Sequence, residues 1–359
     1  MLDPRDVRML GCVPPSESTV RSLPLPALLV ALLAVPFVRA QEPAEIEPVT
    51  GFETQLAGCR GDMCGRVPVP LSNAMLMAPG EWMLTLRVER RRFIGTLDGH
   101  KSVGVGDIIG QGFTMAPRDM DMTMTMLEGM VGLDEDTTLM VMLPYVQNKM
   151  GMVMDDGTEF DMRSSGLGDL QTGLTHRAWQ DEDQRVVFYA GVSVPTGSVD
   201  EKDDMPGFPN ATVDYIMQPG TGTFDLRPAV TWLTDAGLWN FGAQFQWVHA
   251  LGDNSEDWHW GDREDVSVWA VRETGEESSA SLRLTWKRWG DVHGSDDDLD
   301  PMMSPTQDPD LQGGRRIEAA LGFRSGDFVA EVGAPLDENL DGPQLSENWF
   351  ATVGWQFAF

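Results

Sequence analysis

Methionine is unusually abundant in this chain, which has 22 methionines among 359 residues. From 120 to 126 methionine occupies every second position, so these side chains share one face of an extended strand. Thioether sulfur suits soft ions such as Cu(I), but flexible methionine also packs irregular interiors. Packing is the favoured interpretation because no His or Cys joins the set, and a copper or silver path stays open. The candidate metal ligands are Met120, Met122, Met124, Met126, Met140 and Met142.

Charged residues form a second group, because they alternate with apolar residues in segments that have the pattern of strands. Charge is costly toward lipid, so in a membrane barrel such residues are expected to face the interior. An interior ladder of opposite charges either braces the barrel or lines a selective pore, and the sequence leaves both open. The candidate residues of a solute path are Arg87, Glu89, Arg91, Glu128, Arg185, Asp225, Arg227, Arg283, Lys287 and Glu318.

The overall charge excludes one class of partner. The formal net charge is -30, from 56 Asp and Glu against 26 Lys and Arg, whereas phosphate binding needs the opposite sign, so we expect no nucleic acid. The chain has neither a Gly-x-Ser-x-Gly nor a His-Glu-x-x-His motif, and we predict that it is not an enzyme and has no cofactor. Acidic clusters at 200–204 and 296–300 are interpreted as solvated loops, with divalent-cation binding left open.

The first 40 residues are predicted to be a secretory signal. Arg21 precedes an apolar stretch over 23–37, and small residues occupy the positions needed for cleavage after Ala40. A signal-anchor helix is less favoured, because the apolar run is short of the roughly 20 residues that a membrane-spanning helix needs. We therefore expect an exported chain, with residues 1–40 removed.

The segment after the signal lacks a regular pattern. Residues 41–79 are rich in Pro and Gly and carry no sustained hydrophobic period, so we predict an irregular periplasmic N-terminal arm or partial plug. Cys59 and Cys64 lie in this arm, and an oxidising compartment favours a disulfide between them. A metal site is less favoured for this pair, because two thiolates without a nearby His make an incomplete ligand set.

From residue 80 onward the hydrophobic period becomes two. In the run from Trp82 to Phe93, apolar residues alternate with Thr, Arg and Glu, which is typical of a strand with one dry and one wet face. About twelve such runs follow one another, each as long as a tilted membrane strand. Short links alternate with long polar ones, as in outer-membrane barrels. The long links are expected near 94–119, 148–165, 196–220, 252–264 and 290–313.

These patterns predict an all-β protein, a transmembrane antiparallel up-and-down β-barrel of about 12 strands over residues 80–359. An even number of strands, with both ends on the side of the short links, places both termini in the periplasm. The predicted location is the outer membrane of a Gram-negative bacterium. Tryptophan and phenylalanine at the ends of the runs are expected to contact lipid at the membrane interfaces.

The final segment, 351–359, has aromatic residues at alternate positions and ends in Phe359. Such an ending resembles the recognition signal of bacterial outer-membrane barrels, and it implies the barrel-assembly machinery as a partner. A soluble protein would rarely leave a strand of this kind at an unprotected edge. We expect a monomer whose other partners are outer-membrane lipid and a small-molecule solute.

Two short motifs resemble a known family: 166–170, Gly-Leu-Gly-Asp-Leu, opens one run, and 191–197, Gly-Val-Ser-Val-Pro-Thr-Gly, closes the next. They are similar to motifs of outer-membrane transporters associated with the meta-pathway of phenol degradation. The resemblance extends over 80–359 and implies a channel or transporter for a small solute, with aromatic and other hydrophobic compounds as candidates. Two alternatives stay open: a copper- or silver-linked protein that uses the methionines, and a plugged structural barrel whose acidic loops carry the function.

Overall fold

The computed structural model describes residues 65–275 and 277–359. Within these ranges the chain is mostly strand. The helices found there are too short and too polar to cross a membrane. Three sequence predictions concern residues outside the described ranges: the signal at 1–40, the disulfide between Cys59 and Cys64, and the greater part of the arm at 41–79.

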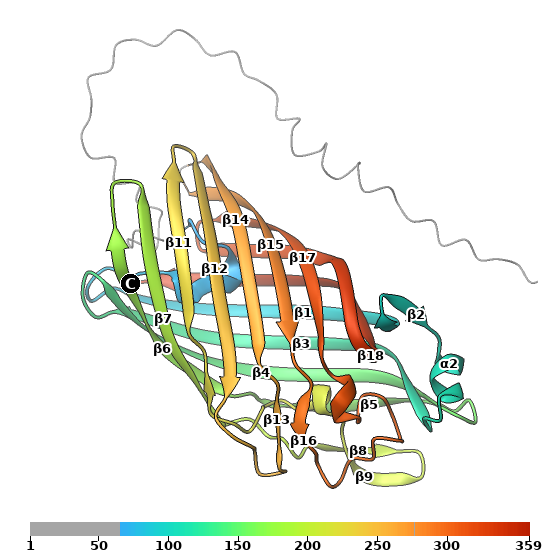
Figure 1. Cartoon of the computed structure of the whole chain (residues 1–359). Coiled ribbons are helices and arrows are strands. Elements are labelled where there is room, and N and C mark those ends of the chain that lie inside the picture. Colours follow the sequence, from blue (N-terminus) through green and yellow to red (C-terminus); the bar gives the residue numbers. More distant parts are fainter. Residues whose placement is uncertain (1–64, 276) are drawn as a thin grey trace, which may run out of the picture. The chain divides into compact units, whose positions relative to one another are not determined.

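Eleven strand elements of the described chain close into one ring of antiparallel neighbours (Figure 1). In ring order they are β1 (Trp82–Gly99), β3 (Met115–Gly132), β4 (Thr137–Met154), β6 (Leu170–Gln180), β7 (Gln184–Val194), β11 (Ala229–Ala236), β12 (Trp239–Ala250), β14 (Arg263–Gly275), β15 (Ser278–Trp289), β17 (Gly314–Ser325) and β18 (Phe328–Ala358). β18 pairs with β1, and the backbones of Trp82 and Phe359 exchange hydrogen bonds of 3.2 and 2.8 Å. The predicted antiparallel β-barrel is thereby confirmed.

β18 is 31 residues long and crosses the barrel wall twice. Its first part, Phe328 to Leu340, pairs with β17, and its second part, from Leu340 to Ala358, pairs with β1. The backbone N–H of Gln356 donates to the carbonyl of Asp327 at 2.9 Å, so the two parts lie side by side as a hairpin. A closed ring of antiparallel neighbours needs an even number of crossings. The doubled β18 supplies the twelfth crossing of the described chain, in agreement with the sequence prediction.

Shorter elements extend this ring or lie in its connecting segments. They are η1 (Val69–Ala74), β2 (Lys101–Val103), α2 (Val105–Gly110), β5 (Glu159–Leu167), β8 (Lys202–Met205), β9 (Phe208–Thr212), η2 (Tyr215–Met217), β10 (Asp225–Leu226), β13 (Trp258–Trp260), β16 (Val292–Gly294) and η3 (Pro309–Leu311). β5 continues the strand β6 along β4, and β10 continues β11 between β7 and β12. Residues 159–180 and 225–236 therefore each form one crossing of the wall with an interruption.

The long links predicted near 94–119 and 148–165 are partly wrong, because strands occupy much of both segments. β3 and β4 stay paired up to Met115 and Met154, and β5 pairs with the end of β4. Polar residues cover these strand ends and pair across strands, as in the 2.9 Å contact between Lys149 Nζ and Asp161 Oδ2. The alternation is inverted there: Met162 is buried on the inner face, whereas Arg163 beside it is exposed. The sequence pattern of a lipid-facing strand is therefore lost.

The two ends of the ring differ in their connections. Short links at 133–136, 181–183, 237–238 and 326–327 lie at one end, called here the short-turn end. Trp82 and Phe359 lie at this end too. The longer connections lie at the other end, called here the long-loop end, as Figure 1 shows.

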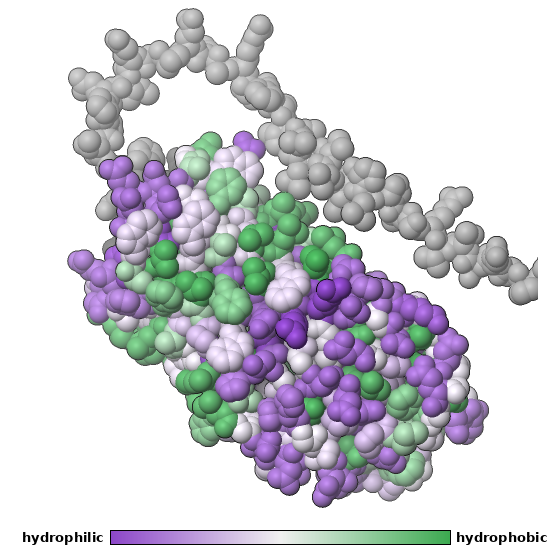
Figure 2. All heavy atoms as spheres, in the orientation of Figure 1, coloured by the Kyte–Doolittle hydropathy of each residue, from purple (hydrophilic) through white to green (hydrophobic). Residues whose placement is uncertain are grey.

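The side chains of the ring alternate between an apolar outer face and a mixed inner face. In β1, Leu84 and Leu86 are exposed on the outside of the barrel. The residues that alternate with them, Thr85 and Arg87, are buried inside. On the face seen in Figure 2, hydrophobic residues gather over the strands toward the short-turn end, and hydrophilic residues cover the long-loop end. An apolar outer face around a polar interior is the pattern of a membrane barrel.

Candidate functional site

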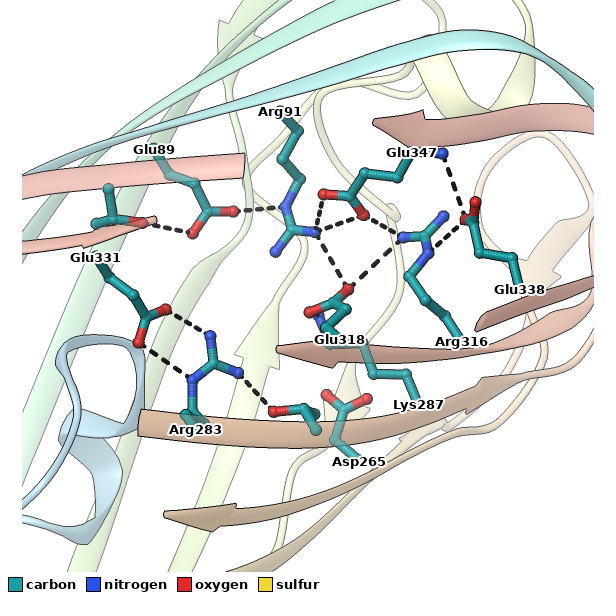
Figure 3. A network of polar contacts seen from close by, with 12 residues as sticks. Glu89, Arg91, Asp265, Arg283, Lys287, Arg316, Glu318, Glu331, Glu338 and Glu347 are labelled. Atoms are coloured by element: carbon teal, nitrogen blue, oxygen red, sulfur yellow. Dashed lines mark hydrogen bonds and ion pairs between the residues drawn. The ribbon is translucent and has the colours of Figure 1, made fainter. Parts of the chain in front are cut away.

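One side of the barrel interior carries a network of ion pairs (Figure 3). Glu318 of β17 is at its centre, with a side chain only 1% exposed. Its carboxylate is 2.8 Å from Lys287 Nζ, 3.6 Å from Arg91 Nη1 and 3.7 Å from Arg316 Nη1. The network, called here the charged wall, comprises Glu89, Arg91, Asp265, Arg283, Lys287, Arg316, Glu318, Glu331, Glu338 and Glu347.

Each arginine of the charged wall is held by more than one group. Arg91 lies 2.6 Å from Glu89 through Nε and 2.9 Å from Glu347 through Nη1. Arg316 Nε donates to Glu338 at 2.7 Å, and the same guanidinium bonds Glu347. Arg316, Glu338 and Glu347 are buried. Removing one of them would leave an uncompensated charge, which typically costs about 3–5 kcal/mol.

Phe350 connects this part of the network to a second ion pair. The guanidinium of Arg283 bonds both carboxylate oxygens of Glu331. The Phe350 ring centroid is 5.0 Å from Cζ of Arg91 and 5.9 Å from Cζ of Arg283. The arginines of the charged wall thus contact carboxylates through their N–H groups and an aromatic ring through their faces.

Two β-bulges place acidic residues in the charged wall. The pairing of β17 with β18 skips Leu336, and the pairing of β1 with β18 skips Asn348. An extra residue in a strand reverses which face the following side chains occupy. Glu338 and Glu347 are therefore buried inside the barrel, although simple alternation along β18 does not place them there.

Several members of the charged wall were not among the residues predicted from the sequence, for different reasons. Arg316 was not predicted, although it lies two residues before Glu318 on the same face of β17 and a strict count would have found it. Asp265 is the third residue of β14, where the alternation of apolar and polar residues has only begun, so it was not predicted. Glu338 and Glu347 had no signal that a count of residues could use, because a bulge is a feature of pairing between strands.

Methionine occupies another side of the interior, on β1, β3, β4 and β5. Two rows of methionines run across neighbouring strands in register. The short-turn row pairs Met83 of β1 with Met130 of β3 and Met140 of β4. The long-loop row consists of Met120 of β3, Met150 of β4 and Met162 of β5. Side chains of both rows are at most 4% exposed. The methionine wall is defined by Met83, Met120, Met122, Met124, Met126, Met130, Met140, Met142, Met150 and Met162.

The structure brings together residues that the sequence placed in two separate groups. Arg87 Nη2 lies 3.5 Å from Met126 Sδ and 3.6 Å from Met142 Sδ. The same nitrogen is 3.8 Å from Glu128 Oε2. Two predicted charges and two predicted metal ligands therefore form one cluster within the methionine wall. Met122 and Met124 lie farther along the same strand, half-buried.

Three of the predicted charges lie outside both walls. Arg185 bonds Asp235 near the short-turn end. Asp225 is buried toward the long-loop end, where the hydroxyl of Thr223 donates to its carboxylate. Arg227 is half-buried between β10 and β11. The ten charges predicted for a solute path thus do not form one continuous ladder.

An N-terminal segment crosses the interior near the short-turn end. Residues 65–79, called here the plug, include η1. Arg87 Nη1 of β1 donates to the carbonyl of Val69 at 2.7 Å. Gln244 Nε2 of β12 donates to Asn73 Oδ1 at 3.1 Å. Because β1 and β12 are not neighbours in the ring, a segment bonded to both must lie across the barrel interior.

Connecting segments pack against one another at the long-loop end. Segments 196–224, 251–262 and 290–313, called here the loop cap, share one apolar cluster. Tyr215 and Trp258 are at its centre, almost fully buried, with ring centroids 5.0 Å apart. This packing gives the loop cap a core of its own.

A buried carboxyl group joins two segments of the loop cap. Asp214 accepts hydrogen bonds from Gln307 Nε2, at 2.7 Å, and from the hydroxyl of Thr306. Burial raises the pKa of Asp214 above its ordinary value, although both hydrogen bonds act in the opposite direction. Burial also raises the pKa of Asp296, in the third segment.

Conventional metal ligands do not cluster in the described part of the chain. No group of three His, Cys, Asp or Glu side chains there could hold a metal ion.

The family model described as "Putative MetA-pathway of phenol degradation" matches residues 95–286, more than half of the 359 residues. The chain belongs to this family. In this member of the phenol-degradation family, the match begins in β1 and ends in β15. The resemblance noted from the two glycine-containing motifs is confirmed. β17 and β18, which carry much of the charged wall, lie beyond the matched residues.

A solved structure supports the fold. An outer-membrane channel from Pseudomonas putida F1 is similar, with a TM-score of 0.54 and 11% sequence identity over 79% of this chain and 97% of that chain. A Pseudomonas aeruginosa FadL homologue has a TM-score of 0.41 and 8% identity, over 85% of this chain and 97% of that chain. No curated protein matches the sequence. The family member described here thus has the fold of an outer-membrane β-barrel.

Proposed function

We propose that this protein is an outer-membrane channel for a small solute and that the charged wall lines the solute path. The observation that carries the proposal is an inner face built of ion pairs. Buried ion pairs contribute little net stability compared with apolar packing of the same volume. A barrel that needed only a filled interior would gain more from apolar side chains there.

The arginines of the charged wall suggest which solutes to test first. Arg316 Cζ is 5.4 Å from the ring centroid of Trp289 and 5.9 Å from that of Phe93. Guanidinium groups that lie over aromatic rings, and bond carboxylates at their edges, would suit an aromatic solute with an acidic group. The family description supports aromatic or other hydrophobic compounds as the solute class.

We propose that the short-turn end faces the periplasm, with both termini on that side. Outer-membrane barrels have short periplasmic turns and longer external loops, which is the asymmetry of this ring. Lipid would contact the apolar outer face. The aromatic end of β18 supports recognition by the barrel-assembly machinery, and a ring that closes on itself supports a monomer. A channel of this kind is not an enzyme.

The plug would have to move for the channel to conduct. Its ties to the barrel include single hydrogen bonds such as Gln244 to Asn73. Each such bond contributes about 1 kcal/mol, so the plug can be loosened without disturbing the ring. The plug is therefore proposed to be the gate of the channel.

Conductance across a planar lipid bilayer tests this proposal. The full chain should show reproducible openings, and Asn73→Ala, which removes the acceptor of Gln244, should raise the open fraction. Benzoate should permeate proteoliposomes faster than cyclohexanecarboxylate, which has the same charge and a similar size without the aromatic ring. Silent bilayers for both the parent and Asn73→Ala would overturn the channel function.

A further inference from the structure

Methionines of the plug and of the barrel wall meet at the short-turn end. Met75 and Met77 of the plug belong to the same buried cluster as the short-turn row, Met83, Met130 and Met140. All five side chains are at most 4% exposed. Residues opposite each other on neighbouring strands have Cβ atoms about 4.5–5.5 Å apart. Flexible thioether side chains in such a row can direct their sulfurs to one point.

A buried carboxylate lies beside this cluster with one oxygen unused. Glu128 is 1% exposed, and its Oε2 accepts a hydrogen bond of 2.7 Å from Ser72 Oγ of the plug. Ser72 Oγ is also 4.0 Å from Met140 Sδ, so Glu128 and Met140 contact the same plug residue. Glu128 Oε1 is buried without a hydrogen-bond partner among the residues that the structure describes. An unpartnered buried oxygen is costly, and a bound cation would compensate for it.

A positively charged group, the guanidinium of Arg87, already contacts thioether sulfurs in this region. Arg87 Nη2 is 3.5 Å from Met126 Sδ, 3.6 Å from Met142 Sδ and 3.8 Å from Glu128 Oε2. The guanidinium shows that the sulfur lone pairs of this wall can face a cation. Leucine would fill the same volume without that property.

We propose that Met83, Met130 and Met140, together with Met75 and Met77 of the plug, form a site for a soft monovalent cation such as Ag(I) or Cu(I). Thioether sulfur prefers such ions, whereas Ca²⁺ or Mg²⁺ would need several oxygen ligands that this cluster lacks. Glu128, which also faces Arg87, would offset part of the added charge. Of the six methionines that the sequence suggested as metal ligands, only Met140 belongs to this site.

The proposed ligands come from two parts of the chain, the plug and the barrel wall. A cation held by the plug and the wall would fasten the plug to the ring, since release of the plug would break part of the coordination. The site would then tie the position of the plug to the supply of the cation. The binding itself does not depend on the channel function and can be tested without it.

Silver is the probe, because Ag(I) needs no reductant. The full chain, with Cys12, Cys59 and Cys64 changed to Ser so that thiolates do not compete, is folded in detergent and titrated with silver nitrate in chloride-free buffer. Calorimetry should give a saturable site with one Ag(I) per chain. Met75→Leu combined with Met77→Leu should weaken binding ~10-fold or more. The matched control, Met150→Leu with Met162→Leu, removes two equally buried methionines of the long-loop row and should leave the affinity unchanged.

Protease protection of the plug gives a second readout. Ag(I) should slow cleavage after Arg66 in the parent and in the control pair, but not in the variant that lacks both plug methionines. Leucine is close to methionine in volume, so both double variants are expected to fold. No saturable binding by the parent, or equal losses in the two double variants, would overturn the proposed site, whatever the conductance measurements show.

Discussion

The methionine wall and the charged wall are parts of the same ring, yet they hold their side chains in place by different means. Met150 of the methionine wall is buried in a cluster of apolar side chains. Glu318 of the charged wall has three cationic neighbours in defined directions. Dispersion forces are weak and distributed, whereas a buried ion pair depends on each partner. The methionine wall should therefore tolerate substitution, and the charged wall should not.

Removing a cation from the charged wall should have the largest effect. Arg316→Leu leaves Glu338 and Glu347 buried without their shared partner, and we expect a loss of about 3–5 kcal/mol in the free energy of unfolding. Urea unfolding in lipid vesicles, followed by tryptophan fluorescence, measures it. Arg315→Leu is the matched control, because Arg315 is adjacent and exposed. Equal losses in the two variants would show that the network contributes nothing specific.

Charge placed on the outer face should cost somewhat less. Leu284 lies next to Arg283 on β15 and is exposed outward. Leu284→Arg would direct charge into lipid, at an expected cost of about 2–4 kcal/mol near the middle of the bilayer. Leu251→Arg, at an exposed site in the loop cap, should cost almost nothing. If the same urea titration gave both variants similar stability, the outer face of β15 would not be in the membrane.

A conservative change in the methionine wall should have a small effect. Met150→Leu conserves volume and apolar character, so we expect a loss of less than about 1.5 kcal/mol in the same assay. A loss as large as that of Arg316→Leu would remove the contrast between the two walls. It would mean that methionine at this position makes a specific contact rather than a packing contact.

Acidity should affect the loop cap locally, with little effect on either wall. The raised pKa of Asp214 means that the folded cap binds this proton more tightly than the unfolded chain does. The cap is therefore stabilised as pH falls through that raised pKa toward the usual value of about 4, and loses this stability as pH rises. Asp296 and Asp308 shift in the same direction. Hydrogen exchange of 196–224, corrected for intrinsic rates, should be slower at low pH.

Asp214→Asn separates this contribution from that of the other two acids. An amide remains neutral at every pH, so the variant should show a weaker pH dependence of exchange in 196–224. Faster exchange at low pH in the parent would contradict the prediction. Exchange in the short-turn end of the ring provides the internal reference, because the three acids do not reach it.

The alternation of apolar and polar residues was enough to predict the barrel, its number of crossings and the side of the wall that most residues face. Arg91 and Glu318 follow this alternation. Glu347 does not, because a bulge depends on how two distant segments pair. The contacts of the plug, such as Asn73 with Gln244, were also beyond prediction, since an irregular segment has no period from which a facing side could be counted. The roles of the predicted solute and metal residues remain predictions.

The hydrogen bonds between Trp82 and Phe359 make the first and last strands the seam of the barrel. This contact has the largest separation along the chain of any in the ring, so its closure is expected late in folding. A nascent chain that lacks its last strand would expose two unpaired edges, each open to a foreign strand. Joining residue 359 to 80 and opening the chain at 181–183 would move the seam to β6 and β7. The order of assembly would then change, while the finished wall would keep every neighbour it has now.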